Sequence, residues 1–132
     1  IRIMLRALID NNVNIMAGTD ANAATVVPGF SLHYELESLS KSGMTNQQAL
    51  YSATVAPSDW MNSNTGKIKV GYNSDLVLLS KNPLKNIKNT KTIEYVFFDK
   101  YVIDKIQIKD ILISIEDANN NNRNEKIEEY IN

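Results

Sequence analysis

The stretch that decides the fold is "NIMAGTDANAATVVPGFSLHYELESL", residues 14–39. Its apolar start ends at Gly18, Thr19 and Asp20, and a loop of small residues then leads into an amphipathic helix. A carboxylate at the end of a buried strand is a common way to position a reactive group. It is also a common way to close a turn or to cap a helix. The local residues leave both interpretations open.

The overall composition is that of an ordinary globular domain. The chain has 132 residues, of which 43% are apolar, and this is enough to bury a core. A net charge of -1 and a pI near 5.8 give no reason to expect nucleic acid or an anionic membrane as a partner. The chain has no cysteine, which excludes a disulfide framework and thiolate metal sites. No apolar run approaches the roughly 20 residues of a membrane span.

The residues before this stretch are typical of a helix whose first residues are missing. Residues 1–10 place apolar side chains at i, i+4, i+7 and i+8, and no capping residue precedes them. Because the first residue is also not methionine, we expect a chain cut from a longer protein, whose signal peptide and localisation stay open. After this helix, Asn12 suits a left-handed cap, and residues 13–17 are typical of a buried strand.

The residues that follow predict three more helices. Apolar side chains recur at helical spacing, and Gly43 ends the first of these segments. Thr45 and Gln48 have the spacing of a capping box, and Pro57 suits the first turn of a helix. The three helices are expected at residues 31–42, 46–55 and 57–62. Residues 1–62 therefore predict an α/β unit.

From Gly66 onward the pattern changes to that of a β-rich segment, which we expect to extend over residues 63–116. Strands are expected at 67–70, 75–80, 93–98 and 101–105, with a hairpin turn at Asp99, and a third apolar stretch after them carries a possible bulge near Asp110. Residues 117–132 are rich in Asn and charge and predict a flexible tail. The expected core consists of Leu5, Leu8, Ile15, Leu36, Leu39, Leu50, Ala53, Leu76, Leu78, Val96 and Phe98.

The order of the short motifs resembles that of a known family. Each motif is weak alone, but the ordered set at this spacing is specific, and it covers about residues 1–104. The chain resembles the C-terminal part of the amidohydrolase superfamily, in the imidazolonepropionase-like and dipeptidase-like group. The motifs are Gly18-Thr19-Asp20-Ala21, Pro28-Gly29-Phe30-Ser31-Leu32-His33, Glu35-Leu36, Gly43-Met44-Thr45, Gln48-Ala49-Leu50, Ala53-Thr54, Ala56-Pro57, Gly66-Lys67-Ile68, Gly71, Asp75-Leu76-Val77-Leu78-Leu79 and Asn82-Pro83-Leu84.

The resemblance implies the last strand and helices of a (β/α)₈ barrel, followed by part of a small β-sandwich that the two chain ends form together. It implies one or two divalent metal ions, usually zinc. Asp20 matches the family's carboxylate at the end of the eighth barrel strand. There it contacts the metal, takes a proton from the attacking water and passes it to the leaving group. Such a carboxylate can steer the attack when it lies within hydrogen-bond reach of the water.

Thr19 and His33 are weaker candidates. Thr19 can hold the loop around Asp20 through a hydrogen bond. His33 is the only histidine, and one His with one carboxylate cannot build a catalytic zinc site. For His33 we weigh a hydrogen-bonding role that orders the loop against a metal ligand and an inert, partly buried ring. Asp75 and Trp60 are better explained by a turn and by packing than by a site.

The chain departs from the family in what it lacks. The family needs a His-x-His pair, a bridging Lys or Glu and two further His ligands, and with one histidine the chain cannot supply them. Two hypotheses follow. The chain is the C-terminal part of a metal-dependent enzyme that cleaves C–N bonds in small amides, cyclic amides or dipeptides, or it is a non-catalytic binding or assembly module. On either hypothesis we expect it to pack against the missing N-terminal barrel or other copies of itself.

Overall fold

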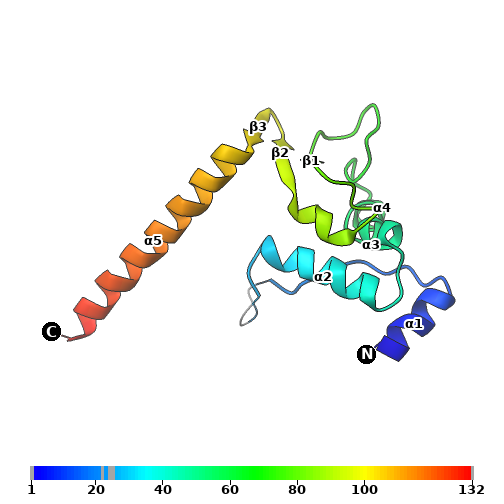
Figure 1. The fold of residues 1–132 in the computed structure, drawn as a ribbon, viewed down its shortest axis with the longest axis horizontal. Helices are drawn as coiled ribbons and strands as arrows, with labels where there is room; N and C mark the ends of the chain where they lie inside the picture. The colour runs from blue at the N-terminus through cyan, green and yellow to red at the C-terminus, as the bar shows by residue number, and fades with distance from the viewer. Residues whose placement is uncertain (1, 22, 24–25, 132) are drawn as a thin grey trace.

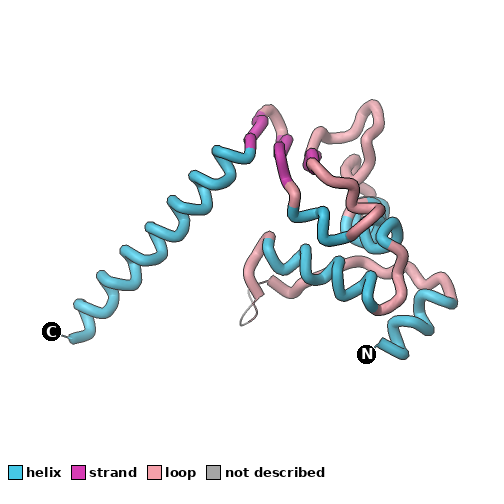
Figure 2. Tube along the Cα trace, viewed as in Figure 1, coloured by secondary structure: helices cyan, strands magenta, loops and turns pink. Residues whose placement is uncertain are grey.

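The structure is a computed structural model that describes residues 2–21, 23 and 26–131. For residue 2 and residues 122–131 it describes the backbone only. Figures 1 and 2 show a group of helices, a small sheet beside it, and one long helix that projects away. The elements in chain order are α1 (Arg2–Asp10), α2 (Phe30–Lys41), α3 (Asn46–Ala53), α4 (Val55–Trp60), β1 (Leu76–Leu79), the 3-10 helix η1 (Ile87–Lys91), β2 (Ile93–Phe98), β3 (Tyr101–Asp104) and α5 (Lys105–Ile131).

The core lies where α2, α3 and η1 meet. Its buried members are apolar and come from all three elements and the α2–α3 turn: Leu36, Leu39, Met44, Ala49 and Ile87. Four residues that the sequence predicted for the core pack against this cluster and are partly buried: Leu5, Ile15, Leu50 and Ala53. Burying such side chains is the main favourable term in folding. The helical part of the predicted core is therefore confirmed, except Leu8, which is 36% exposed.

The predicted helix boundaries and caps are close to those observed. In α3 the Gln48 backbone N–H donates to Thr45 Oγ1 at 3.1 Å, and the Thr45 N–H donates to Gln48 Oε1 at 2.8 Å. This is the predicted capping box, which satisfies two N–H groups that the helix cannot pair itself. Asn12 has the left-handed φ of 53° expected of a C-terminal cap. Helix α4 begins at Val55, two residues earlier than expected, so Pro57 still lies in its first turn.

The three strands form one antiparallel sheet in the order β1-β2-β3. Leu76 pairs with Phe97, and Phe98 pairs with Tyr101 across the predicted turn, where Asp99 has a φ of 51°. The strands expected at 75–80, 93–98 and 101–105 are thus confirmed. Two predicted core residues of this sheet are wrong for this chain, because Leu78 is 51% and Phe98 60% exposed. The described residues leave half or more of each of these two residues exposed.

Two other predicted strands are absent from the part of the chain that the structure describes. Residues 13–17 and 67–70 carry no strand assignment, although both were predicted from apolar runs. Ile68 is 90% and Val70 99% exposed. A strand exists only when another strand completes its backbone hydrogen bonds. Neither segment finds such a partner among the described residues, so the strand predictions are wrong here.

The apolar stretch after β3 is helical. Helix α5 takes up the residues expected to form a further strand with a bulge near Asp110, and its backbone continues through the Asn-rich segment. A helix satisfies its own backbone groups, whereas a strand would need a neighbour. The main contacts of α5 are with β2 and β3, and it then leaves the rest of the molecule (Figure 1). The division at residues 62 and 116 and the flexibility of the tail stay predictions.

No helix in the described ranges is both long enough and apolar enough to cross a membrane.

Candidate functional site

The segment that leads to Asp20 is extended and lies on the helices. The Val13 N–H donates to the Leu8 carbonyl at 3.0 Å, and the Ala17 N–H donates to the Ser52 carbonyl at 2.9 Å. These bonds join the segment to α1 and to α3. Its side chains alternate between two faces, as they do in a strand. Partly buried are Ile15, Ala17 and Thr19, whereas Asn14, Met16, Gly18 and Asp20 are exposed.

Asp20 stands at the end of the exposed face of this segment. Its φ is 51°, and its carbonyl accepts a hydrogen bond from the Ala23 N–H at 3.0 Å, so the chain turns here. The carboxylate forms no hydrogen bond or ion pair with any other residue that the structure describes. Helix α2 begins only at Phe30, so Asp20 is not its N-cap. An Asx turn would use residue 22, which lies outside the described residues. Asp20 therefore offers a carboxylate at the open end of the segment.

Thr19 and His33 occupy different surroundings. Thr19 is partly buried beside Asp20 and donates no side-chain hydrogen bond within the described ranges. His33 lies on α2, and its Nδ1 is 3.0 Å from Thr90 Oγ1. The Thr90 hydroxyl already donates its only proton to the Ile87 carbonyl, at 2.9 Å. With the Thr90 proton on the Ile87 carbonyl, the tautomer of His33 that carries its proton on Nδ1 completes the contact with Thr90.

The surroundings of His33 also favour its neutral form. Burial lowers the pKa of its imidazole, and the positive charge of Lys91 lowers it further. The hydrogen bond joins α2 to η1 across 57 residues of sequence. His33 thus fastens the helix that follows the Asp20 loop, and its hydrogen-bond partner is Thr90 rather than Asp20.

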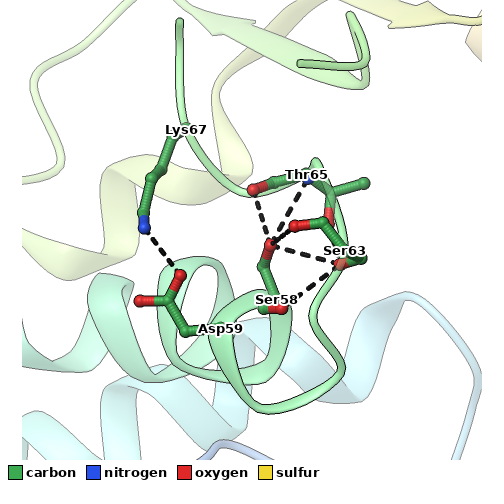
Figure 3. Close-up of polar contacts among 5 residues, drawn as sticks. All are labelled: Ser58, Asp59, Ser63, Thr65 and Lys67. Atoms are coloured by element: carbon green, nitrogen blue, oxygen red, sulfur yellow. Dashed lines mark hydrogen bonds and ion pairs between the residues drawn. The ribbon is translucent and has the colours of Figure 1, made fainter. Parts of the chain in front are cut away.

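Sequence reasoning missed a network of serine and threonine side chains between α4 and the loop after it (Figure 3). The Ser58 hydroxyl, only 1% exposed as a residue, lies 2.7 Å from the Thr65 carbonyl and 2.9 Å from that of Ser63. Gly66 follows with a φ of 72°, and a Cβ there would lie 2.3 Å from the Thr54 carbonyl oxygen. A serine in the short helix expected at residues 57–62 was the one local signal for it.

This network has a structural and not a catalytic character. A serine nucleophile needs a neighbouring base to accept its proton. The chain's single histidine is hydrogen-bonded to Thr90, and Asp59 pairs instead with Lys67 at 2.6 Å (Figure 3). The network therefore fixes the path of residues 63–67 out of the helical part.

A complete metal site is not present in the described part of the chain. No group of three or more His, Cys, Asp or Glu side chains there could hold a metal ion together. A catalytic zinc ion usually takes three protein ligands and keeps a further position open. The Asp20 carboxylate fits the role of one oxygen ligand. The other ligands would have to come from outside these residues.

Comparison with known proteins identifies the family. The model of the amidohydrolase family matches residues 2–109. This match covers most of the chain, and the chain belongs to the amidohydrolase family. The superfamily resemblance drawn from the motifs is thereby confirmed, whereas the imidazolonepropionase-like subgroup stays a prediction. No curated protein matches the chain.

Two solved structures share its fold. One is a Xaa-Pro dipeptidase with methionine bound in the active site, and the other is molinate hydrolase. Each has 24% sequence identity to this chain and a TM-score of 0.68. The matches cover 78% and 76% of this chain, but only 25% of either neighbour. The chain thus spans about a quarter of the length of these hydrolases, and the likeness concerns the fold alone.

Proposed function

We propose that this chain forms the C-terminal part of a metal-dependent amidohydrolase that cleaves C–N bonds in small amides, cyclic amides or dipeptides. Membership of the family supports a hydrolase. The fold neighbours are hydrolases, one of them a dipeptidase, and this agrees with the proposed class of reaction. The geometry around Asp20 supplies the most specific argument.

The observation that carries the proposal is the two-faced extended segment before Asp20. Ile15 and Ala17 pack toward the chain's own core, and Met16 and Asp20 are exposed. A barrel strand has this arrangement, because one face meets the helices and the other faces the barrel interior. In the complete protein, the other strands of a (β/α)₈ barrel would complete the backbone hydrogen bonds of this segment, and it would then form the last strand of that barrel. The sheet β1-β2-β3 would belong to the adjoining β-sandwich.

In this arrangement Asp20 would act as ligand and base. One of its oxygens would hold a divalent metal ion, usually zinc in the family, together with ligands from the rest of the barrel. When bound, that metal supplies Lewis-acid activation of water and of the scissile carbonyl. Asp20 would accept a proton from the attacking water and hand it to the leaving nitrogen. Thr19 and His33 would act indirectly. Thr19 would hold the loop around Asp20, and His33 would anchor α2 through its hydrogen bond with Thr90.

The test is Asp20→Asn in the complete parent protein, assayed on a panel of amides and dipeptides with metal content measured alongside. Asn keeps the size of the side chain but removes the base, so kcat should fall by roughly 10²- to 10⁴-fold. The matched control is Asp99→Asn, because Asp99 is also exposed and has the same φ of 51°. The control should leave kcat unchanged. A kcat for Asp20→Asn within threefold of the parent would rule out the proposed role.

The second candidate is a non-catalytic module that binds other chains. The exposed apolar side chains of the sheet, such as Leu78 and Phe98, favour an assembly role. These exposed side chains do not separate the two candidates, because the rest of an enzyme or further copies of this chain would also cover them. The gene separates the candidates, because an upstream His-x-His pair is required for the enzyme and is not required for the module.

A further inference from the structure

A cavity of about 480 Å³ lies between α2 and α5, where the long helix leaves the sheet. Its walls are mostly apolar, and they come from α2, β2 and α5: Phe30, Tyr34, Ile93, Ile108 and Leu112. This volume and this lining are typical of pockets for small molecules. Asp20 and Thr19 are not part of it, so it is separate from the proposed catalytic position. We call it the α2–α5 cavity.

The charged groups of the α2–α5 cavity are all cationic. Lys91, Lys105 and Lys109 contribute to its lining, and no Asp or Glu does. The Lys105 ammonium is 3.3 Å from Glu94 and is partly neutralised. Lys91 Nζ lies 4.0 Å from the centre of the Tyr34 ring, which attracts the cation without cancelling its charge. Lys109 forms no ion pair within the described ranges. Two lysine charges therefore remain uncompensated around an apolar space.

His33 also lines the α2–α5 cavity and adds no positive charge to it at neutral pH. Its Nδ1 is hydrogen-bonded to Thr90 Oγ1 at 3.0 Å. Its pKa is lowered by burial and by Lys91, so an anion placed near Lys91 would reverse part of that effect. The imidazole is thus a built-in reporter of charge in the cavity.

We propose that the α2–α5 cavity binds an amphipathic carboxylate, with its alkyl or aryl body on the apolar walls and its carboxylate beside Lys91 and Lys109. The apolar walls favour a hydrocarbon body, because its transfer from water is favourable. The two lysines favour an anionic head and disfavour a cationic one. Binding at this cavity is independent of the proposed hydrolase reaction. If decanoate does not bind, the proposed role of Asp20 is unaffected.

The test is NMR on the 132-residue chain with decanoate as the probe and decyltrimethylammonium as its cationic counterpart. His33 is the only histidine, so its ring protons give a single set of signals. Decanoate should shift these signals in a saturable way and raise the pKa of His33. The cationic amphiphile should not. Equal binding of the two probes, or no saturable response to decanoate, would overturn the proposal.

Two sets of variants localise the binding. Lys91→Gln combined with Lys109→Gln should weaken decanoate binding roughly tenfold or more, because charge-assisted hydrogen bonds are lost. Leu112→Glu places an anion on the cavity wall and should abolish binding, and Leu112 is exposed enough to accept the change. Lys100→Gln is the matched control, since Lys100 also lies over a tyrosine ring but outside the cavity. Unchanged affinity in the double variant would contradict the proposed site.

Discussion

Residues 13–17 and the β2–β3 hairpin were both predicted as strands, and only the hairpin forms them. In the hairpin, Phe98 pairs with Tyr101 across a turn of two residues, so the partner strand lies next in the chain. Residues 14–17 show the alternating exposure of a strand, but among the described residues their long-range backbone bond, from the Ala17 N–H, goes to the Ser52 carbonyl of a helix. The difference between the regions is the distance along the chain to a pairing partner.

An antiparallel strand can be completed by a local turn, whereas a parallel strand needs a crossover and a partner far away in sequence. The same requirement applies to residues 67–70, where Ile68 and Val70 project from a segment that has no partner strand among the described residues. It also explains α5, because the isoleucine-rich stretch predicted as a further strand forms a helix, which needs no partner strand. An apolar pattern therefore predicts a strand only for a segment whose partner strand is present. Where no partner lies close in the chain, the segment takes another conformation.

The largest expected effect compares the two halves of the predicted core. Leu36→Ala removes a side chain that is 4% exposed at the meeting point of α2, α3 and η1. It should lower the free energy of unfolding by about 2–5 kcal/mol, because it leaves a cavity. Leu78→Ala, the same substitution on the sheet, should cost less than about 1 kcal/mol, because Leu78 is 51% exposed.

Urea unfolding of the two variants, followed by circular dichroism, measures both values on the full chain. Equal losses would mean that the exposed face of the sheet is covered in solution, by another copy of the chain or by other residues. That result would remove the contrast between the two halves and strengthen the expectation of self-association.

The helical part could be predicted from sequence because its signals are local. Thr45 and Gln48 are three residues apart, and the apolar spacing within each helix is fixed by the helix itself. The β2–β3 hairpin was predictable for the same reason, because its turn at Asp99 lies between the two strands. The wrong predictions at Leu78, Phe98, residues 13–17 and the α5 segment share one cause. Each prediction requires a partner strand or a covering surface that the described residues do not supply.

The candidate site divides in the same way. Asp20 could be proposed from Gly18-Thr19-Asp20 and the motifs that follow it, and its place at an open end agrees with that proposal. The bond from His33 to Thr90 could not be proposed, because no local pattern joins residues 57 positions apart. The remaining metal ligands cannot be derived from a chain with one histidine.

A smaller effect tests the local signals. Thr45→Ala removes the side chain that accepts the Gln48 N–H at 3.1 Å. It should cost about 1 kcal/mol in the free energy of unfolding, because one end group of α3 loses its partner. Thr45→Ser keeps the hydroxyl and should cost only a fraction of this. Urea unfolding of the pair gives the comparison, and an equal loss in both variants would show that the threonine methyl matters more than the cap.

The smallest effect concerns the contact between α2 and η1, the hydrogen bond between His33 and Thr90. The pKa of His33 is lowered in the folded chain, first by burial and then by Lys91, from an ordinary value of 6.5. As the pH falls, the unfolded chain therefore takes up this proton first, so stability should decline from about pH 6.5 down to the folded pKa. The pKa of Glu37 is also lowered, chiefly by its hydrogen bond with Lys41, but its ordinary value is 4.5, so the loss of stability from Glu37 begins at lower pH.

The measurement is the urea midpoint of unfolding at about pH 7.5 and pH 5.5. The two midpoints should differ in the parent chain and differ less in Lys91→Gln, whereas Lys100→Gln should behave like the parent. A His33→Gln variant that keeps the full pH dependence would show that another group is responsible.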